Sequence, residues 1–316
     1  MKKEKRQLWG YIDKTGKYVI SPAFDDACDF HENLAAVRID WQRGYIDRGG
    51  SYVREPRFQF AGNFHDGMAR VMTDDKFGFI DCHGNYLIAP AFDKASDFHH
   101  GLSMISLNGK YGYINPDGNY VAAPEYDYLG EFHEGLAWMK FNGKYGYIDR
   151  EGNRAIAPQF DNANDFSDGL AVVMTHDRYG YINRDGVFVL SPGFDVAGNF
   201  YNGVAHVKKE GKWEWIDKNG APAAAPEEAA APVEYHEGLA VVKTGDKYGY
   251  ADESGTIVIA PAFWQAEPFC EGMARIKTGP RSKWAYIDRS GTYPFKERFA
   301  AAEDFSGGLA RVMTEI

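Results

Sequence analysis

The sequence predicts an all-β protein built from nine tandem units of about 34 residues. A Tyr-Ile-Asp core or a close variant recurs at this spacing, and each copy contains short runs in which apolar residues alternate with other residues. Glycine and proline separate these runs as turn residues, and the chain has 35 and 14 of them. The nine cores begin at Tyr11, Tyr45, Phe79, Tyr113, Tyr147, Tyr181, Trp215, Tyr250 and Tyr286.

The first strand of a repeat is predicted by a period of two. In the copy GLAWMKFNGKYGYIDREGNRAIAPQFDNANDF, which starts at Gly135, the segment LAWMK places Ala137 and Met139 on one face. The same alternation of a small and a larger apolar residue recurs as LAVVM from Leu170 and LARVM from Leu309. Such alternation is typical of a strand with one buried face.

Two turns flank the second strand, KYGYID. Asn142 and Gly143 are residue types that accept the positive φ angles of a tight hairpin, so we expect a hairpin between the first and second strands. Asp149 and Gly152 stand at the first and fourth positions of a type I turn, where the carboxylate accepts hydrogen bonds from turn amides. The repeated aspartates are therefore predicted to be turn residues.

The third strand is the apolar run before each proline. Because proline has no amide hydrogen, we expect the strand to end there and an irregular crossover to begin. The crossover carries Phe160 and Phe166, whose spacing suits a compact loop or one helical turn that inserts between repeats. Each repeat is thus predicted to be a three-stranded antiparallel meander.

These motifs together resemble the bacterial WG-repeat family, also called KWG repeats. The core is seen with its tryptophan in LWGYID at residues 8–13, and Ile-x-Pro, Phe-Asp and Gly-Leu-Ala follow it in most copies. The resemblance covers residues 8–313 and weakens in the seventh copy, where Glu214 replaces the glycine. It implies a tandem β-repeat protein that is usually regarded as a binding module, and it supplies no catalytic residue.

Two architectures fit the repeats. An open β-solenoid or superhelix tolerates any copy number and is the favoured prediction, whereas propeller blades usually have four strands in roughly 40–45 residues. A closed propeller-like ring is the alternative, because the chain begins with the second strand of one repeat and ends with the first strand of another. We predict a lead-in at 1–7 and a single array at 8–316, with a degenerate Ala/Pro-rich segment at 221–232 that forms a surface loop, a hinge or a docking site.

Composition narrows the classes of function. The formal charge of −10 and the lack of a basic stripe argue against nucleic acid as a partner and leave a basic protein as a candidate. The chain has no apolar run long enough to span a membrane and no N-terminal apolar region typical of a signal peptide. We therefore expect a cytoplasmic protein without a membrane partner, although this does not rule out export by a route that reads no such signal.

No catalytic or metal-binding constellation is predicted. The histidine row formed by His31, His65, His99, His133 and His236 is interrupted by Ser167 and Tyr201, which favours a polar turn position over a metal site. A phosphate-binding loop and a nucleophile elbow are absent from the sequence. We expect neither a cofactor nor a metal, and we expect the protein not to be an enzyme.

Binding residues are sought where the repeats differ. The variable row, two residues after the first residue of each first strand, lies opposite the Ala/Val face. It consists of Ala36, Arg70, Met104, Trp138, Val172, His206, Val241, Arg275 and Arg311. The candidates for partner binding are Arg70, Met104, Trp138, His206, Arg275 and Arg311, together with Trp41 and Trp264, which fall outside the repeat pattern. Packing of the row between repeats is the competing interpretation.

The sequence therefore predicts a non-catalytic repeat scaffold for protein–protein interaction, for example one that sequesters a basic partner or acts as an immunity-type binder. A carbohydrate or cell-wall binding module is the alternative, because exposed aromatic residues stack on sugars.

Overall fold

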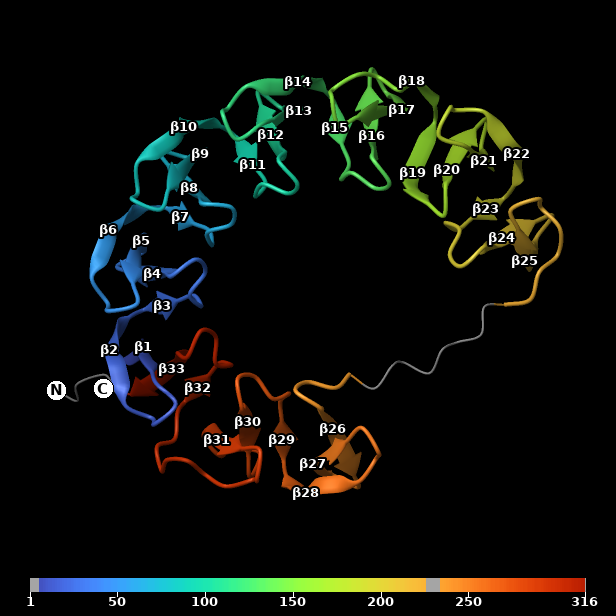
Figure 1. The fold of residues 1–316 in the computed structure, drawn as a ribbon. Coiled ribbons are helices and arrows are strands. Elements are labelled where there is room, and N and C mark those ends of the chain that lie inside the picture. Colours follow the sequence, from blue (N-terminus) through green and yellow to red (C-terminus); the bar gives the residue numbers. More distant parts are fainter. Residues whose placement is uncertain (1–5, 226–233, 316) are drawn as a thin grey trace. The chain divides into compact units, whose positions relative to one another are not determined.

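The computed structural model describes residues 6–225 and 234–315, and these form small antiparallel sheets that follow one another along the chain (Figure 1). No helix occurs in these two ranges. The prediction of an all-β tandem array of antiparallel units is confirmed. By internal contacts the described residues fall into two compact units, one with 6–75, 79–86 and 234–315 and the other with 76–78 and 87–225.

Each repeat supplies a first and a second strand joined by the predicted hairpin. The first strands are β4 (Leu34–Ile39), β8 (Met68–Thr73), β12 (Ser103–Leu107), β16 (Leu136–Phe141), β20 (Leu170–Thr175), β24 (Val204–Lys209), β26 (Leu239–Thr244), β30 (Met273–Lys277) and β33 (Ala310–Glu315). The second strands are β1 (Gln7–Ile12), β5 (Gln42–Asp47), β9 (Lys76–Asp81), β13 (Lys110–Ile114), β17 (Lys144–Asp149), β21 (Arg178–Ile182), β25 (Lys212–Asp217), β27 (Lys247–Asp252) and β31 (Ala285–Asp288). Asn142 and Gly143 have φ angles of 51° and 79°, as the hairpin requires.

The third strands and the crossovers complete the sheets. The third strands are β2 (Tyr18–Phe24), β6 (Tyr52–Phe58), β10 (Tyr86–Phe92), β14 (Tyr120–Tyr126), β18 (Ile156–Phe160), β22 (Phe188–Phe194) and β28 (Ile257–Phe263). The crossovers contain the short strands β3 (Asp26–Ala27), β7 (Phe60–Ala61), β11 (Lys94–Ala95), β15 (Tyr128–Leu129), β19 (Asn162–Ser167), β23 (Val196–Ala197), β29 (Gln265–Ala266) and β32 (Ala301–Ala302).

The expectation that proline ends the third strand is wrong. β18 continues through Pro158 to Phe160, and its pairing with β17 passes from Tyr147↔Ile156 to Tyr145↔Phe160, which leaves a bulge at the proline. The bulge brings the backbone close to Gly146, where a Cβ atom would lie 2.4 Å from the Ile156 carbonyl oxygen. Glycine is required at this position because any side chain would collide with the bulged strand.

The crossover is a strand rather than a loop or a helical turn. In the copy that precedes Gly135, Tyr128 pairs with Lys140 and Leu129 pairs with Met139, so β15 adds a fourth strand beside β16. Within the described residues six of the nine sheets have four strands, in the order crossover, first, second and third. The fourth strand was not predicted, because two residues are too few to show a period.

The core lies between consecutive sheets. Tyr147 on β17 is fully buried, its ring centroid is 4.8 Å from that of Phe166 on β19, and its hydroxyl donates a 2.7 Å hydrogen bond to the Asn164 carbonyl. The two crossover phenylalanines, Phe160 and Phe166, are both buried in the same cluster. Each sheet is therefore held to the next by one buried tyrosine and by the crossover that follows it.

The Asp-x-x-Gly turns have the predicted geometry. The Asp149 carboxylate accepts hydrogen bonds from the amides of Glu151 and Asn153 at 3.1 and 2.7 Å, and the Gly152 amide donates to the Asp149 carbonyl. In an equivalent turn, hydrogen bonds from Thr15 lower the pKa of Asp13 despite the opposing effect of burial. These aspartates are thus engaged in turn structure.

One sheet combines both ends of the chain. β1 pairs antiparallel with β33, from Gln7↔Glu315 to Ile12↔Ala310, and β32 and β2 complete the order β32-β33-β1-β2. The complementary end strands noted in the sequence therefore pair. The strand begins at Gln7, which the sequence placed in the lead-in, and residues 1–5 of that lead-in lie outside the described residues.

The degenerate segment at 221–232 is described only as far as residue 225. There, Pro222 forms an isolated bridge with Ile216, and the Ala223 amide donates to the Trp215 carbonyl, where a third strand would otherwise begin. The prediction of a loop, hinge or docking site concerns mainly residues 226–232, which lie outside the described residues. Among the helices of the described chain, none could cross a membrane.

Candidate functional site

The variable row faces the next sheet. Ala137 and Met139 pack in the cluster shared with the preceding sheet, whereas Trp138 packs against the cluster shared with the following one. Both faces of the first strand are therefore covered. The six candidate residues of the row, Arg70, Met104, Trp138, His206, Arg275 and Arg311, are all half-buried.

In four copies the row residue stacks on the aromatic side chain that precedes the glycine of the second strand. The Arg311 guanidinium lies 5.3 Å from the Trp9 ring centroid, and the Arg275 guanidinium lies at the same distance from Trp284. The rings of His206 and Trp213 are 4.6 Å apart, and those of Trp138 and Tyr145 are 5.8 Å apart. In these four copies the row therefore lies against a ring of its own sheet. This contact explains part of its burial.

The other two candidates of the row also have neighbours. The Arg70 guanidinium lies 5.0 Å from the ring of Phe60 on the crossover strand of the same sheet. Met104 packs against the cluster that contains Tyr113 and Leu129. Packing within the array is thus the observed role of these side chains.

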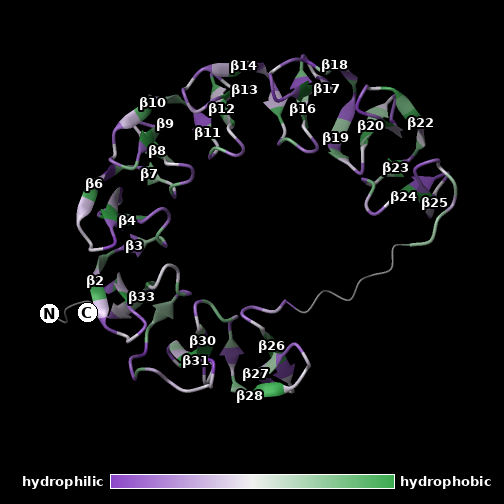
Figure 2. Ribbon diagram, in the orientation of Figure 1, coloured by the Kyte–Doolittle hydropathy of each residue, from purple (hydrophilic) through white to green (hydrophobic). Residues whose placement is uncertain are grey.

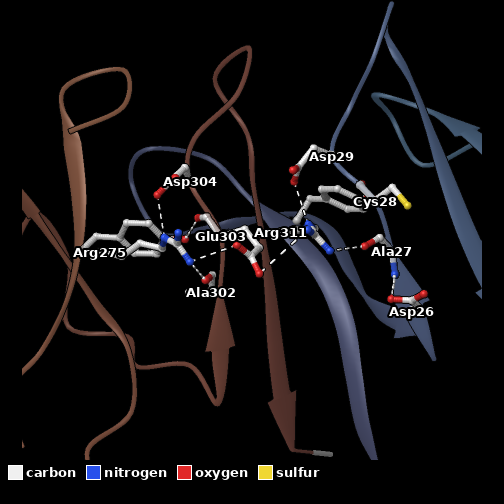
Figure 3. A network of polar contacts seen from close by, with 11 residues as sticks. Asp26, Ala27, Cys28, Asp29, Arg275, Ala302, Glu303, Asp304 and Arg311 are labelled. Carbon is white, nitrogen blue, oxygen red and sulfur yellow. Dashed lines mark hydrogen bonds and ion pairs between the residues drawn. The ribbon is translucent and has the colours of Figure 1, made fainter. Parts of the chain in front are cut away.

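Arg275 and Arg311 are anchored in equivalent polar networks (Figure 3). Arg275 donates to the Asp304 carboxylate at 2.6 Å and to the Ala302 carbonyl. Arg311 donates to the Asp29 carboxylate at 2.8 Å and to the Ala27 carbonyl at 2.6 Å, although Asp29 lies at the opposite end of the chain. The sheet made from both chain ends thus reproduces the contact that joins two repeats elsewhere.

Trp138 forms part of an aromatic ladder, which we define as Tyr111, Tyr128, Trp138 and Tyr145. Consecutive ring centroids are 4.6, 5.7 and 5.8 Å apart. Tyr128 and Trp138 are nearly parallel, with an angle of 9° between their planes. Tyr128 is 46% exposed, and the other three rings are half-buried.

The ladder is held in place from below. A Cβ atom on Gly130 would lie 2.4 Å from the indole Nε1 of Trp138, so the absence of a side chain at residue 130 makes room for the indole. Trp138 also hydrogen-bonds the carboxylate of Asp165, which lies 3.6 Å from the His133 Nε2 atom. Burial raises the pKa of Asp165, whereas His133 and the Trp138 hydrogen bond oppose that rise.

Trp41 and Trp264 are the exposed members of the predicted set. Trp41 is 83% exposed on the β4–β5 hairpin and has a φ angle of 70°, where other copies have glycine. A bulky residue in the left-handed region is strained, and such strain is found more often at functional positions. The Arg38 guanidinium lies 5.4 Å from the Trp41 ring. Trp264 is 44% exposed, with the Lys247 ammonium 5.9 Å from its ring.

The histidine row lies in the turns before the first strands. His31 and His65 have ring centroids 5.4 Å apart, and each forms a bridge across its own turn. In the described ranges no group of three or more histidine, cysteine or acidic residues is arranged to hold a metal ion.

Sequence reasoning missed an apolar surface on the third strands. We define the edge strip as the first two residues of each third strand that are large, apolar and exposed. Of the 19 exposed large hydrophobic residues in the described part of the chain, ten belong to it. They are Tyr18, Val19, Tyr52, Tyr86, Leu87, Tyr120, Phe188, Val189, Ile257 and Val258.

The third strands stand at the ends of their sheets, and β22 and β28 are largely green in Figure 2. A continuous apolar run suggested buried strands, and only a strand's position at the sheet edge distinguishes exposed from buried apolar residues.

Comparison with solved structures gives remote likenesses. The crystal structure of a eukaryotic initiation factor is 11% identical over 94% of this chain and 97% of that chain, with a TM-score of 0.42. The structure of Hsv2 from Kluyvelomyces marxianus is 7% identical over 82% of this chain and 91% of that chain, with a TM-score of 0.35. No curated protein matches the sequence.

The family model of the WG-containing repeat matches seven stretches of the chain. They are residues 9–40, 44–77, 77–111, 111–145, 145–178, 179–213 and 248–279. The matches leave out residues 214–247, which contain the degenerate segment, and cover well over half of the sequence. The protein therefore belongs to the family of WG-containing-repeat proteins.

Proposed function

We propose that this WG-repeat protein is a non-catalytic scaffold that binds another protein through its edge strip. The observation that carries the proposal is the recurrence of exposed large apolar residues at one position of successive repeats. Exposed apolar surface that recurs in this way is costly unless it is covered in a complex. A repeat array offers such a surface to an extended or large partner.

The charge of the chain favours a basic partner. The formal net charge is −10, which attracts a basic protein over long range and repels nucleic acid. The repeated aspartates support a non-catalytic role, because their carboxylates accept hydrogen bonds from turn amides, as Asp149 does from Asn153. We propose neither a cofactor nor a metal for this function.

The test is capture of partners by the full-length protein and by a variant with a polar edge strip. The variant carries Val19→Thr, Leu87→Thr, Val189→Thr and Val258→Thr, which keep β-branched or strand-compatible side chains while removing apolar surface. Tagged protein is incubated with lysate from the native cell, and retained proteins are quantified by mass spectrometry. We expect proteins retained by the wild type to be lost from the variant.

A control variant separates apolar contact from general surface change. It replaces exposed lysines on two hairpins, Lys209, Lys212, Lys243 and Lys247, with glutamine. This control should retain the same proteins. Equal retention by the edge-strip variant would contradict the proposal. Retention on insoluble polysaccharide with the same dependence on the edge strip would favour the carbohydrate-binding alternative instead.

A further inference from the structure

We infer that the aromatic ladder is a docking site for a proline-rich segment of a protein partner. The inference rests on the proposed function in one respect, namely that the partner is a protein. The ladder belongs to one copy only: Lys94 and Met104 occupy the positions of Tyr128 and Trp138 in the preceding sheet, and Asn162 and Val172 occupy them in the following one. Such a copy-specific cluster on a common scaffold is where selective binding is expected.

The hydrogen-bonding groups around the ladder are mainly donors. The Lys94 ammonium lies 3.2 Å from the Tyr111 hydroxyl, and the Lys140 ammonium lies 5.2 Å from the Tyr145 ring centroid. Tyrosine hydroxyls can donate as well. The ladder therefore combines aromatic surface with donors that seek acceptors.

The nearby carboxylates already have partners. Asp127 pairs with Lys110 and accepts from the Gly143 amide. Asp161 pairs with Lys144 and accepts from an amide of the next hairpin. These hydrogen bonds to the lysines lower the pKa of both carboxyls, so the two remain charged acceptors for their own partners.

A proline-rich segment complements this arrangement. Proline has carbonyl acceptors and no amide donor, so it does not need the acceptors that the ladder lacks. A saccharide hydroxyl needs both. A cationic ligand is disfavoured, because Lys94 and Lys140 already lie against the end rings of the ladder.

The spacing of the rings also fits. A polyproline II helix has three residues per turn and rises about 3.1 Å per residue, so prolines one turn apart are about 9 Å apart. Two consecutive ring spacings of the ladder, 4.6 and 5.7 Å, cover a similar length. Aromatic side chains that line a surface are a recurring means of binding this helix.

The test is fluorescence anisotropy of fluorescein-labelled decaproline with the full-length protein. We expect saturable binding that Tyr128→Ala weakens by about tenfold or more, the loss typical of a central aromatic anchor. Gly130→Ala should also weaken binding, because its Cβ would displace the Trp138 indole. Because the contacts are neutral, affinity should change little with added salt.

The matched control is Tyr120→Ala, which removes a tyrosine that is 51% exposed on β14, away from the ladder. It should leave decaproline binding unchanged. Absence of saturable binding, or equal weakening by Tyr120→Ala, would overturn the inference. Ladder-dependent displacement of the label by cellohexaose would overturn it in favour of a saccharide. If decaproline fails while the edge strip still captures proteins, only the assignment of the ladder falls.

Discussion

The buried tyrosine hydroxyl is predicted to be a measurable part of the adhesion between repeats. Tyr147→Phe keeps the ring against Phe166 and removes the 2.7 Å hydrogen bond to the Asn164 carbonyl. Because that carbonyl is only partly buried, its loss should lower the free energy of unfolding by about 1–2 kcal/mol. Tyr120→Phe, on an exposed ring, should change the free energy of unfolding by less than about 0.5 kcal/mol.

The protein contains its own model for a rescue. One repeat has Phe79 at the tyrosine position, and the carbonyl equivalent to that of Asn164, on Ser96, accepts a 2.8 Å hydrogen bond from the buried Ser103 hydroxyl. Ser103 corresponds to Ala171 in the repeat that follows Tyr147. Ala171→Ser should therefore offer a replacement donor for the Asn164 carbonyl.

A double-mutant cycle measures this replacement. Tyr147→Phe and Ala171→Ser together should cost about 1 kcal/mol less than the sum of the two single changes. Urea unfolding followed by tryptophan fluorescence gives the values, read from the transition of the unit that holds residues 87–225 if the two units unfold separately. Strict additivity would refute the reasoning, because it would mean that the serine hydroxyl does not take over the hydrogen bond.

Three further predictions concern the backbone, the pH and the exposed tryptophan. Gly146→Ala should lower the free energy of unfolding by about 2–3 kcal/mol through collision with the Ile156 carbonyl, whereas Gly143→Ala, at a φ angle of 79° in open space, should cost about 1 kcal/mol; equal losses of the urea midpoint would contradict the bulge. Burial raises the pKa of Tyr181, so its contribution to stability is complete below about pH 10, its unfolded value, and is lost as the pH rises above it; absorbance at 295 nm should show ionisation together with unfolding, and ionisation of the folded protein near pH 10 would count against it. Trp41→Asn should raise the melting temperature, because relief of left-handed strain, about 1–2 kcal/mol, exceeds the lost contact with the Arg38 guanidinium, about 0.5–1 kcal/mol; an unchanged or lower value would show that the hairpin does not strain the tryptophan.

The sequence was sufficient for the elements that have a local chemical cause. The hairpin at Asn142 and Gly143 and the turn at Asp149 follow from the conformations that these residues favour. The alternation of Ala137 and Met139 identified a buried face, which packs on the preceding sheet. Each of these predictions needs only a few neighbouring residues.

Features that depend on a second segment were not predictable in the same way. Pro158 was expected to end a strand, but the bulge opposite Gly146 lets the strand continue to Phe160. The fourth strand, as in β15, exists only because the next first strand pairs with it. The site predictions likewise depended on what covers a side chain, and the sequence alone did not show that Trp138 faces the next sheet.

Variation between copies is compensated mainly within the array, and this changes what a variable residue indicates. Where the row carries arginine, as at Arg275 and Arg311, a tryptophan lies beneath it and a carboxylate from the following crossover accepts its hydrogen bond. Such a residue can differ from its equivalents without contacting a partner. A copy-specific residue indicates binding only when it also leaves apolar or hydrogen-bonding surface exposed. Tyr128 meets that condition, whereas Arg275 does not, because 14% of its side chain is exposed and its donors contact Asp304 and Glu303.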